Sequence, residues 1–491
     1  MVTQVQQNFE DAKQRIKEQV QSRNIEQRES PPLVGIVGTG LSALISAFIL
    51  ISFGYRVVLF GKDKWIGGRI LTWRPYDSYP QQFAEAGLMR ISSSAHPEMT
   101  FFIKDVFELE TMPFHLNKRL VLPTGMIDIE LSSYKDWKPL LSSNDTQHPS
   151  ELVKRMYREL DNVYNAGGVQ ALIELAEEES NLSWTKKFYT DRTAHTLLSY
   201  LGIEARSHLS VIESYLHRKV GHYRDLYYMT DGSDALVRAL VNELEASDVC
   251  IYSEATVNAI HSRANDIEMN ISYDNDSIDK PNAIIVDHVI VTAPLPAVNR
   301  ITITWDNEPA FEFSQAIEKT HYTAGLKILA MLNSEFIKHW KMKPGQQIST
   351  MKGLHVIVSP AGQHRSNFLS TILNYTWSEN ADKDRNKTEQ EQLEYLIKRL
   401  TEEIAPFKHE WIDEYFIADW SKLSEGIGPA YHIYDFNHLW NLKRRSNRII
   451  LAGDWDSYVN RRWGEASMNS AIKACASIIF DEPDFTMLMN E

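Results

Sequence analysis

The sequence predicts an α/β protein in which a parallel sheet is assembled from both ends of the chain. Three observations predict this. An apolar strand, helix and strand follow one another over residues 33–60, a buried strand and helix occupy residues 448–479, and residues 151–222 between them are charged and strongly helical. Strand–helix–strand units are typical of parallel sheets covered by helices. With 491 residues, the chain is long enough for two or three structural units.

The first thirty residues are rich in Gln, Glu, Lys and Arg. Residues 7–28 place Phe9, Ile16 and Val20 at roughly helical spacing, which predicts an amphipathic helix that ends before Pro31. It could pack on the body of the protein, pack on a second copy in a homodimer, or remain a solvated leader. No apolar targeting segment is found here, so we expect a cytoplasmic protein.

The first strand–helix–strand unit comprises Leu33–Val37, Leu41–Phe53 and Arg56–Phe60, and its first turn is rich in glycine. The turn reads Gly38-Thr39-Gly40-Leu41-Ser42-Ala43, where the first glycine allows a tight turn and the second lets backbone approach a pyrophosphate. The helix that follows offers free N–H groups to phosphates. These features predict nucleotide binding; the alternative is a tight turn without a ligand. Glycines and Arg56 interrupt the apolar stretch, which argues against a membrane span.

An acidic residue normally ends the second strand of such a unit and holds the ribose hydroxyls. Gly61 stands at that place, and Asp63 two residues later is the candidate substitute. The missing carboxylate weakens an interpretation as an NAD-binding unit.

The rest of the chain alternates between the nucleotide-binding domain and other segments. Strands are expected at Arg119–Leu122 and Met126–Leu131, strand-like segments resume from Val249, and the final strand and helix are placed at Arg448–Ala452 and Glu465–Ile479. The predicted organisation is an N-terminal helical extension (1–30), a nucleotide-binding domain (31–97, 223–299 and 441–491), a substrate domain (98–150 and 300–440) and a helical insertion (151–222).

The bulk composition argues against several classes of function. A net charge of −14 disfavours a protein that binds nucleic acid. The two cysteines, Cys250 and Cys475, are far apart, so we expect neither a disulfide framework nor a cysteine metal site. No metal, nucleic-acid or membrane partner is expected.

Two segments resemble a known family. VVLFGKDKWIGGR, residues 57–69, resembles the flavin amine oxidase superfamily, and AEAGLMR, residues 84–90, followed by His96-Pro97, resembles its L-amino-acid oxidase and amino-acid 2-monooxygenase branch, which includes tryptophan and lysine monooxygenases. The resemblance implies a Rossmann-type FAD-binding domain interleaved with an α+β substrate domain and a helical insertion. No cysteine lies near Asp456-Ser457-Tyr458, where some amine oxidases link the flavin, so non-covalent FAD is expected.

The glycine turn and the resemblance together propose a set of FAD-binding residues. The later motifs are divergent: Asp454 replaces a glutamate, and Arg462 and Ala466 replace glycines. The proposed residues are Gly38, Gly40, Leu41, Ser42, Asp63, Gly68, Arg69, Gly87, Leu88, Met89, Arg90, Val257, Gly453, Asp454, Trp463, Gly464, Glu465 and Ala466.

Four residues are candidates for the chemistry. Arg90 matches the arginine that pairs with a substrate carboxylate, and a guanidinium offers the planar fork this needs; its alternative is pairing with Glu85 or a backbone carbonyl. Trp463, with Tyr431 behind it, is the candidate apolar wall. Lys327 matches the lysine that holds a water against flavin N5; its alternative is a strand lysine that points to solvent.

The function expected from these residues is oxidation of an L-amino acid by dioxygen, giving imine, then 2-oxo acid, ammonia and hydrogen peroxide. Three alternatives remain open: a decarboxylating 2-monooxygenase that yields an amide and CO2, a monoamine or polyamine oxidase, and a flavin-binding module without turnover. The many aromatic residues, 12 Trp and 21 Tyr, are a weak hint of a large apolar side chain on the substrate.

Overall fold

The computed structural model describes residues 2–274, 280–304, 320–322, 324–360, 368–377, 381, 387–423, 430–432, 448–457, 463–482, 484–485 and 488. Its body is a parallel sheet in the order β10-β2-β1-β14-β23. All four pairings are parallel, and they join Cys250–Tyr252, Arg56–Phe60, Leu33–Val37, His288–Val291 and Ile449–Leu451. The prediction of an α/β fold with a sheet built from both ends of the chain is confirmed.

Both faces of this sheet are covered. Ile36 of β1 belongs to a core shared with α2 (Leu41–Ser52), α9 (Asp234–Ala246) and α17 (Gly464–Ile479). Its neighbour Val37 belongs to the core shared with a second sheet. Side chains alternate between the faces of a strand, so a continuous apolar strand such as β1 is suited to this doubly covered position. The second sheet has the order β13-β12-β11-β15 and joins Ala283–Val286, Ile267–Tyr273, Ala255–Ser262 and Thr302–Thr304.

The N-terminal helix α1 (Val2–Ser22) packs on the body rather than standing in solvent. Phe9, Ile16 and Val20 are buried in the same core as α2 and α17. The helix ends at Ser22, earlier than predicted, because Arg23 adopts a positive φ of 58° and its guanidinium bonds the Val106 carbonyl and Glu243. None of the described helices has the length and apolar character needed to cross a bilayer.

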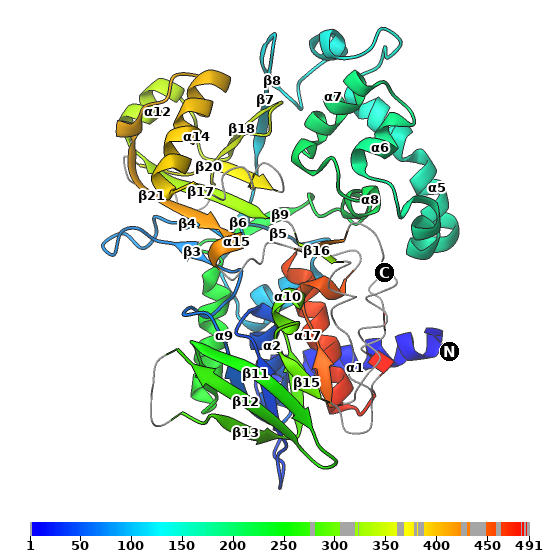
Figure 1. The fold of residues 1–491 in the computed structure, drawn as a ribbon, viewed down its shortest axis with the longest axis vertical. Coiled ribbons are helices and arrows are strands. Elements are labelled where there is room, and N and C mark those ends of the chain that lie inside the picture. The colour runs from blue at the N-terminus through cyan, green and yellow to red at the C-terminus, as the bar shows by residue number, and fades with distance from the viewer. Residues whose placement is uncertain are drawn as a thin grey trace.

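A seven-stranded sheet lies above the body in Figure 1, with α12 (Ser334–Trp340) and α14 (Glu389–Glu403) beside it. Along β17, Leu326, Ile328 and Ala330 pack into the core with α14, whereas Leu329 and Met331 face the opposite side. The alternation therefore places Lys327 on the side away from α14. The strand order is β21-β17-β20-β19-β18-β7-β8, joining Ile412–Asp419, Gly325–Leu332, Leu369–Trp377, His355–Val358, Gln346–Thr350, Asn117–Leu122 and Gly125–Asp128.

The helical insertion forms a third layer with its own core, to the upper right in Figure 1. It comprises α5 (Pro149–Ala176), α6 (Asn181–Lys186), α7 (Asp191–Leu201) and α8 (Val211–Lys219), and the buried Trp184 belongs to this core. The remaining short strands and α-helices are β3 (Thr72–Trp73), β4 (Ala84–Glu85), β5 (Ile91–Ser92), β6 (Thr111–Pro113), β9 (Leu226–Met229), β16 (Thr320–Tyr322), β22 (Ala430–His432), α3 (Pro97–Thr100), α4 (Tyr134–Trp137), α10 (Leu295–Val298) and α15 (Trp420–Leu423).

Candidate active site

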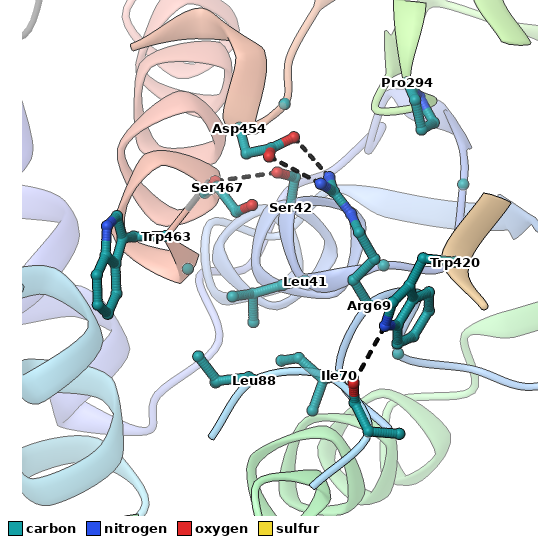
Figure 2. Close-up of a pocket in the computed structure, with 18 of the residues that line it drawn as sticks. Leu41, Ser42, Arg69, Ile70, Leu88, Pro294, Trp420, Asp454, Trp463 and Ser467 are labelled. Atoms are coloured by element: carbon teal, nitrogen blue, oxygen red, sulfur yellow. Dashed lines mark hydrogen bonds and ion pairs between the residues drawn. The ribbon is translucent and has the colours of Figure 1, made fainter. Parts of the chain in front are cut away.

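A cavity of about 370 Å³ lies where these layers meet, and it is lined by segments distant in sequence. Its lining includes the glycine turn, the Gly67–Ile70 loop, Ala86–Arg90, Lys327 and Trp463. In Figure 2 Trp463 and Trp420 lie on opposite sides of the view, with Leu41 between them. The volume is in the range of small-molecule and cofactor sites.

The glycine turn forms a cradle that side chains would fill. Gly38 has a φ of 120°, and a Cβ there would overlap the Thr292 hydroxyl. A Cβ on Gly68 would come within 3.1 Å of the Gly40 Cα, so the two glycine turns abut. Among the described residues, no side chain caps the first turn of α2, which leaves its N–H groups for another acceptor. These features suit the pyrophosphate of a dinucleotide such as FAD.

The side chain of Ser42 makes a hydrogen bond within the protein. Its hydroxyl donates to the Ser467 carbonyl of α17 at 3.1 Å (Figure 2), so it ties α2 to the C-terminal helix. Ser42 nevertheless lines the cavity, as do Gly38, Gly40 and Leu41.

Arg69 and Asp454 form a two-pronged ion pair at the cavity wall. The guanidinium donates to the two carboxylate oxygens at 2.9 and 2.6 Å, and Asp454 is buried (Figure 2). Such a fork is stronger and more directional than a single hydrogen bond. The pair clamps the loop after β2 to the end of β23, and both residues line the cavity.

The absence of an acid at Gly61 has a steric cause. A Cβ at this position would overlap the side chain of Thr39, which follows β1. Asp63 lines the cavity close by and is half-buried. Asp63 therefore remains the candidate for the ribose hydroxyls.

Arg90 lines the cavity and faces aromatic rings. Its guanidinium carbon lies 5.7 Å from the centre of the Phe114 ring and 5.9 Å from that of Tyr223. Burial lowers the pKa of Arg90. Glu85 is not its partner: that carboxylate accepts from the Ser233 N–H at 2.7 Å and hydroxyl at 2.6 Å. No carboxylate of the described residues forms an ion pair with Arg90.

Lys327 is buried and points into the cavity, so the alternative of a solvent-facing strand lysine is wrong. Its ammonium donates to the carbonyls of Glu85 at 2.9 Å and Gly87 at 2.7 Å, and lies 4.9 Å from the centre of the Tyr375 ring. Burial lowers its pKa, although the charge of Glu85 acts in the opposite direction. Lys327 thus holds the segment that leads to Arg90 and can exchange a proton more readily than an exposed lysine.

Trp463 lines the cavity and contacts two histidines: His96, which belongs to the His96-Pro97 motif, and His222, which no motif marks. Its ring lies 4.8 Å from that of His222 and nearly parallel to it, with an interplanar angle of 9°; the His96 ring is also 4.8 Å away. His96 Nε2 and His222 Nδ1 share a hydrogen bond of 2.7 Å. Burial and the neighbouring His222 lower the pKa of His96 to about 2, so His96 is neutral and serves to position the tryptophan.

Three proposed FAD-binding residues do not line the cavity. Val257 is buried between the two sheets of the body. The Glu465 carboxylate turns away and accepts from the N–H groups of Glu98 and Met99 at 3.1 and 2.9 Å, and Ala466 is fully buried in α17. Their motifs lie at the cavity, but their own side chains point into the protein.

The other proposed residues fall into two groups. Gly87, Leu88, Met89, Gly453 and Gly464 line the cavity. The backbone of Tyr431 in β22 pairs with that of His321 in β16, but the Tyr431 side chain is outside the described residues, as is all of Arg462. The cavity also contains side chains that the sequence did not single out, because no motif marks them: Arg206, Tyr223, Tyr375 and Trp377.

The chain is similar to known proteins over most of its length. A family model described as flavin containing amine oxidoreductase matches residues 40–479. The L-amino-acid oxidase of Siganus canaliculatus is 22% identical over 91% of this chain and 85% of its own length, and that of Mus musculus is 24% identical over 91% and 71%.

Among solved structures, a redesigned putrescine oxidase aligns with a TM-score of 0.72 at 16% identity, and the cyclohexylamine oxidase from Brevibacterium oxydans IH-35A with 0.70 at 16%. Each alignment covers 92% of this chain and 99% of the other. At this identity the likeness concerns the fold.

Proposed function

The chain belongs to the flavin containing amine oxidoreductase family, and from that premise we propose that it oxidises the α-amine of an L-amino acid with non-covalent FAD as cofactor. The observation that carries this proposal is Arg90, a guanidinium at the cavity wall that no described carboxylate neutralises. A ligand carboxylate would supply the missing charge.

Arg90 suits this role through its shape as well as its charge. A guanidinium presents a planar fork that matches a carboxylate and fixes its orientation. Gripping the α-carboxylate would set the position of the adjacent Cα within the cavity. Binding in one orientation is a large part of what a protein contributes to such a reaction.

The glycine turns at the cavity are suited to the cofactor. Gly38, Gly40 and Gly68 would hold its pyrophosphate, and Asp63 its ribose. FAD would supply the acceptor at N5 for the hydride equivalent that leaves the substrate Cα, and the protein supplies orientation and electrostatics.

Lys327 and the aromatic residues complete the site. The Lys327 Nζ holds a proton beside the cavity and can orient a water molecule there. Trp463, Trp420 and Tyr375 exclude bulk water, which strengthens the charge interactions inside. The expected products are imine, then 2-oxo acid and ammonia, with hydrogen peroxide from dioxygen.

Anaerobic mixing of the purified flavoprotein with single L-amino acids tests the proposal, with putrescine and cyclohexylamine as the amine arm. We expect one or more amino acids to bleach the flavin absorbance and the two amines to leave it unchanged. Bleaching by the amines alone would overturn the proposal. An aerobic assay then separates an oxidase, which releases peroxide and 2-oxo acid, from a 2-monooxygenase, which releases amide and CO2.

A further inference from the structure

Helix α1 carries two lysines that reach a buried carboxylate of another segment. Lys13 and Lys17 are four residues apart, so they lie on the same face of α1. Their ammonium groups form ion pairs with the two carboxylate oxygens of Glu98, at 2.6 and 2.8 Å. Glu98 belongs to α3 and is only 1% exposed. A charge this deeply buried is costly unless it is paired, so the two lysines stabilise it where it lies.

Helix α3 connects this ion pair to the cavity wall. The N–H groups of Glu98 and Met99 donate to the carboxylate of Glu465 at 3.1 and 2.9 Å. Glu465 is the second residue of α17 and follows Gly464, which lines the cavity. A Cβ on Gly464 would come within 2.9 Å of the Met99 sulfur, so α3 packs closely on the first residue of α17. Contacts from α3 therefore fix the start of α17 at the cavity.

The residue before α3 contacts the next part of the wall. The ring of His96 lies 4.8 Å from that of Trp463, which immediately precedes α17 and lines the cavity. The N–H of Ser92 donates to His96 Nδ1 at 3.0 Å and holds the ring in place. A displacement of α3 would therefore disturb Trp463 through His96 as well as the start of α17.

The charge of Lys13 acts on both buried carboxylates. Burial acts to lower the pKa of Lys13, but the charges of Glu98, Glu10 and Glu465 raise it above its usual value. Loss of the two lysines would leave the Glu98 carboxylate in the core beside Glu465 without these ion pairs. Like charges repel strongly where water is excluded, so α3 would move or a carboxyl group would take up a proton.

The two lysines are presented by a fixed backbone. Phe9, Ile16 and Val20 of α1 are buried in the core shared with α2 and α17. The family model begins at residue 40, so α1 lies outside the residues that it matches. The contacts of α1 are therefore a property of this chain that the family match does not describe.

We propose that α1 is a positioning element of the active site, in which Lys13 and Lys17 neutralise Glu98 and so hold Trp463 and Gly464 at the cavity wall. Both lysines act through α3, because neither belongs to the described cavity lining. This inference rests on the proposed function only in taking the cavity as the flavin site.

The test removes the two cations and then the charge that they neutralise. In the purified holoenzyme of Lys13→Met/Lys17→Met, we expect an altered visible circular dichroism spectrum of the bound flavin. We also expect kcat/KM per bound flavin to fall by roughly 10- to 100-fold, as a small displacement of orienting residues allows. The temperature at which flavin is released should fall by roughly 5 °C.

Two further variants show whether charge is the cause. Adding Glu98→Gln to the double variant should reverse most of these changes, because no unpaired carboxylate then remains. Lys13→Arg/Lys17→Arg should stay close to the wild type, since it keeps both positive charges. If the double variant does not accumulate as folded protein, the same comparison is made between Lys17→Met and Lys17→Met/Glu98→Gln.

Lys154→Met is the matched control, since Lys154 is an exposed lysine of α5 whose ion pair with Glu151 lies on the surface. It should match the wild type in flavin spectrum, flavin release and turnover.

The outcomes separate this inference from the proposed function. A double variant with an unaltered flavin spectrum and unaltered kcat/KM per bound flavin would overturn the inference, whatever its melting temperature, because α1 would then serve the fold alone. Failure of Glu98→Gln to restore the double variant would also overturn it. The flavin spectrum and flavin release need no substrate, so they test α1 even if no amino acid is oxidised and the proposed function fails.

Discussion

Arg69 and Arg90 line the same cavity but have opposite surroundings. Arg69 makes two hydrogen bonds to the buried carboxylate of Asp454, whereas Arg90 faces the rings of Phe114 and Tyr223 and pairs with no carboxylate of the described chain. Arg69 stabilises the fold, since it joins the loop after β2 to the residue that follows the last strand. The Arg90 guanidinium can bind the carboxylate of a ligand.

The comparison shows that a charged side chain at a cavity has to be judged by its partners. A buried charge without a partner is costly, so a protein retains one where a ligand supplies the partner. The same criterion separates Glu465, bonded to two backbone N–H groups, from a residue that could serve the cofactor.

The largest expected effect is that of Arg90→Met. Loss of the fork should lower kcat/KM for L-amino acids by roughly 100- to 10,000-fold, the value of one to two charge-assisted hydrogen bonds in a dry site. Flavin content and melting temperature should stay close to the wild type. Steady-state kinetics checks this, with Arg158→Met, at an exposed arginine of α5 away from the cavity lining, as control. A change of only a few-fold in Arg90→Met would refute the role of Arg90.

The next largest effect is expected at Lys327, a buried cation of the cavity. Lys327→Met should lower kcat by roughly 10- to 100-fold, as expected for loss of a group that positions a proton or water. In stopped-flow experiments the reaction of the reduced enzyme with dioxygen should suffer more than anaerobic reduction by substrate. An unchanged oxidative rate would contradict this, and the exposed Lys338→Met is the control.

The role of Lys327 also predicts how the oxidative rate changes with pH. Burial lowers the Lys327 pKa, so the cationic form is lost as pH rises through a value below that of an ordinary lysine. The oxidative rate of the wild type should therefore fall with rising pH in that range. The rate of Lys327→Met should be low and independent of pH over the same range.

Breaking the Arg69–Asp454 ion pair should lower the stability of the protein and leave turnover unchanged. Asp454→Asn should lower stability by about 1–2 kcal/mol, because it weakens a half-buried ion pair that solvent screens in part. Thermal melts should show a lower melting temperature and purified protein should carry less flavin, with kcat/KM per bound flavin unchanged. Asp191→Asn, in an exposed ion pair with Lys186, should have little effect. A variant with full stability and lost turnover would reverse the assignment of the two arginines.

The smallest effect is a pH dependence of stability at Glu465. Burial and the nearby Glu98 raise its pKa to about 7, so its stabilising contribution is complete below about pH 4.5 and is lost as pH rises toward 7. Relative to the wild type, Glu465→Gln should gain on the order of 1 kcal/mol between pH 5 and pH 8, because the wild-type carboxyl loses its contribution over that range and the amide does not titrate. Melting curves at the two pH values check this. A difference between the two proteins that does not change with pH would show that the carboxylate is ionised throughout.

The bounds of an element were predicted best where its own residues form a clear pattern, such as a continuous apolar run. The strands at Leu33–Val37 and Arg56–Phe60 agree with β1 and β2, because continuous apolar runs bounded by glycine or proline are typical of buried parallel strands. The end of α1 could not be predicted, since the contacts of Arg23 with Val106 and Glu243 decide it.

The candidate site was only partly predictable for a related reason. A motif brings a segment to the cavity, but the side chains of neighbouring residues leave a helix or strand in different directions. This is why Gly464 lines the cavity while Glu465 and Ala466 do not. Arg206 and His222 carry no motif, because the insertion contributes them only through packing.

The sequence by itself determined the parallel sheet, the glycine cradle and the family, and it singled out Arg90 as a candidate. Each of these depends on residue types at short spacing. The tertiary structure decided which charges are already paired, why Gly61 has no room for a side chain, and that Arg206 shares a cavity with Arg90. Those properties depend on distances between segments that are remote along the chain, which only the packing of the three layers sets.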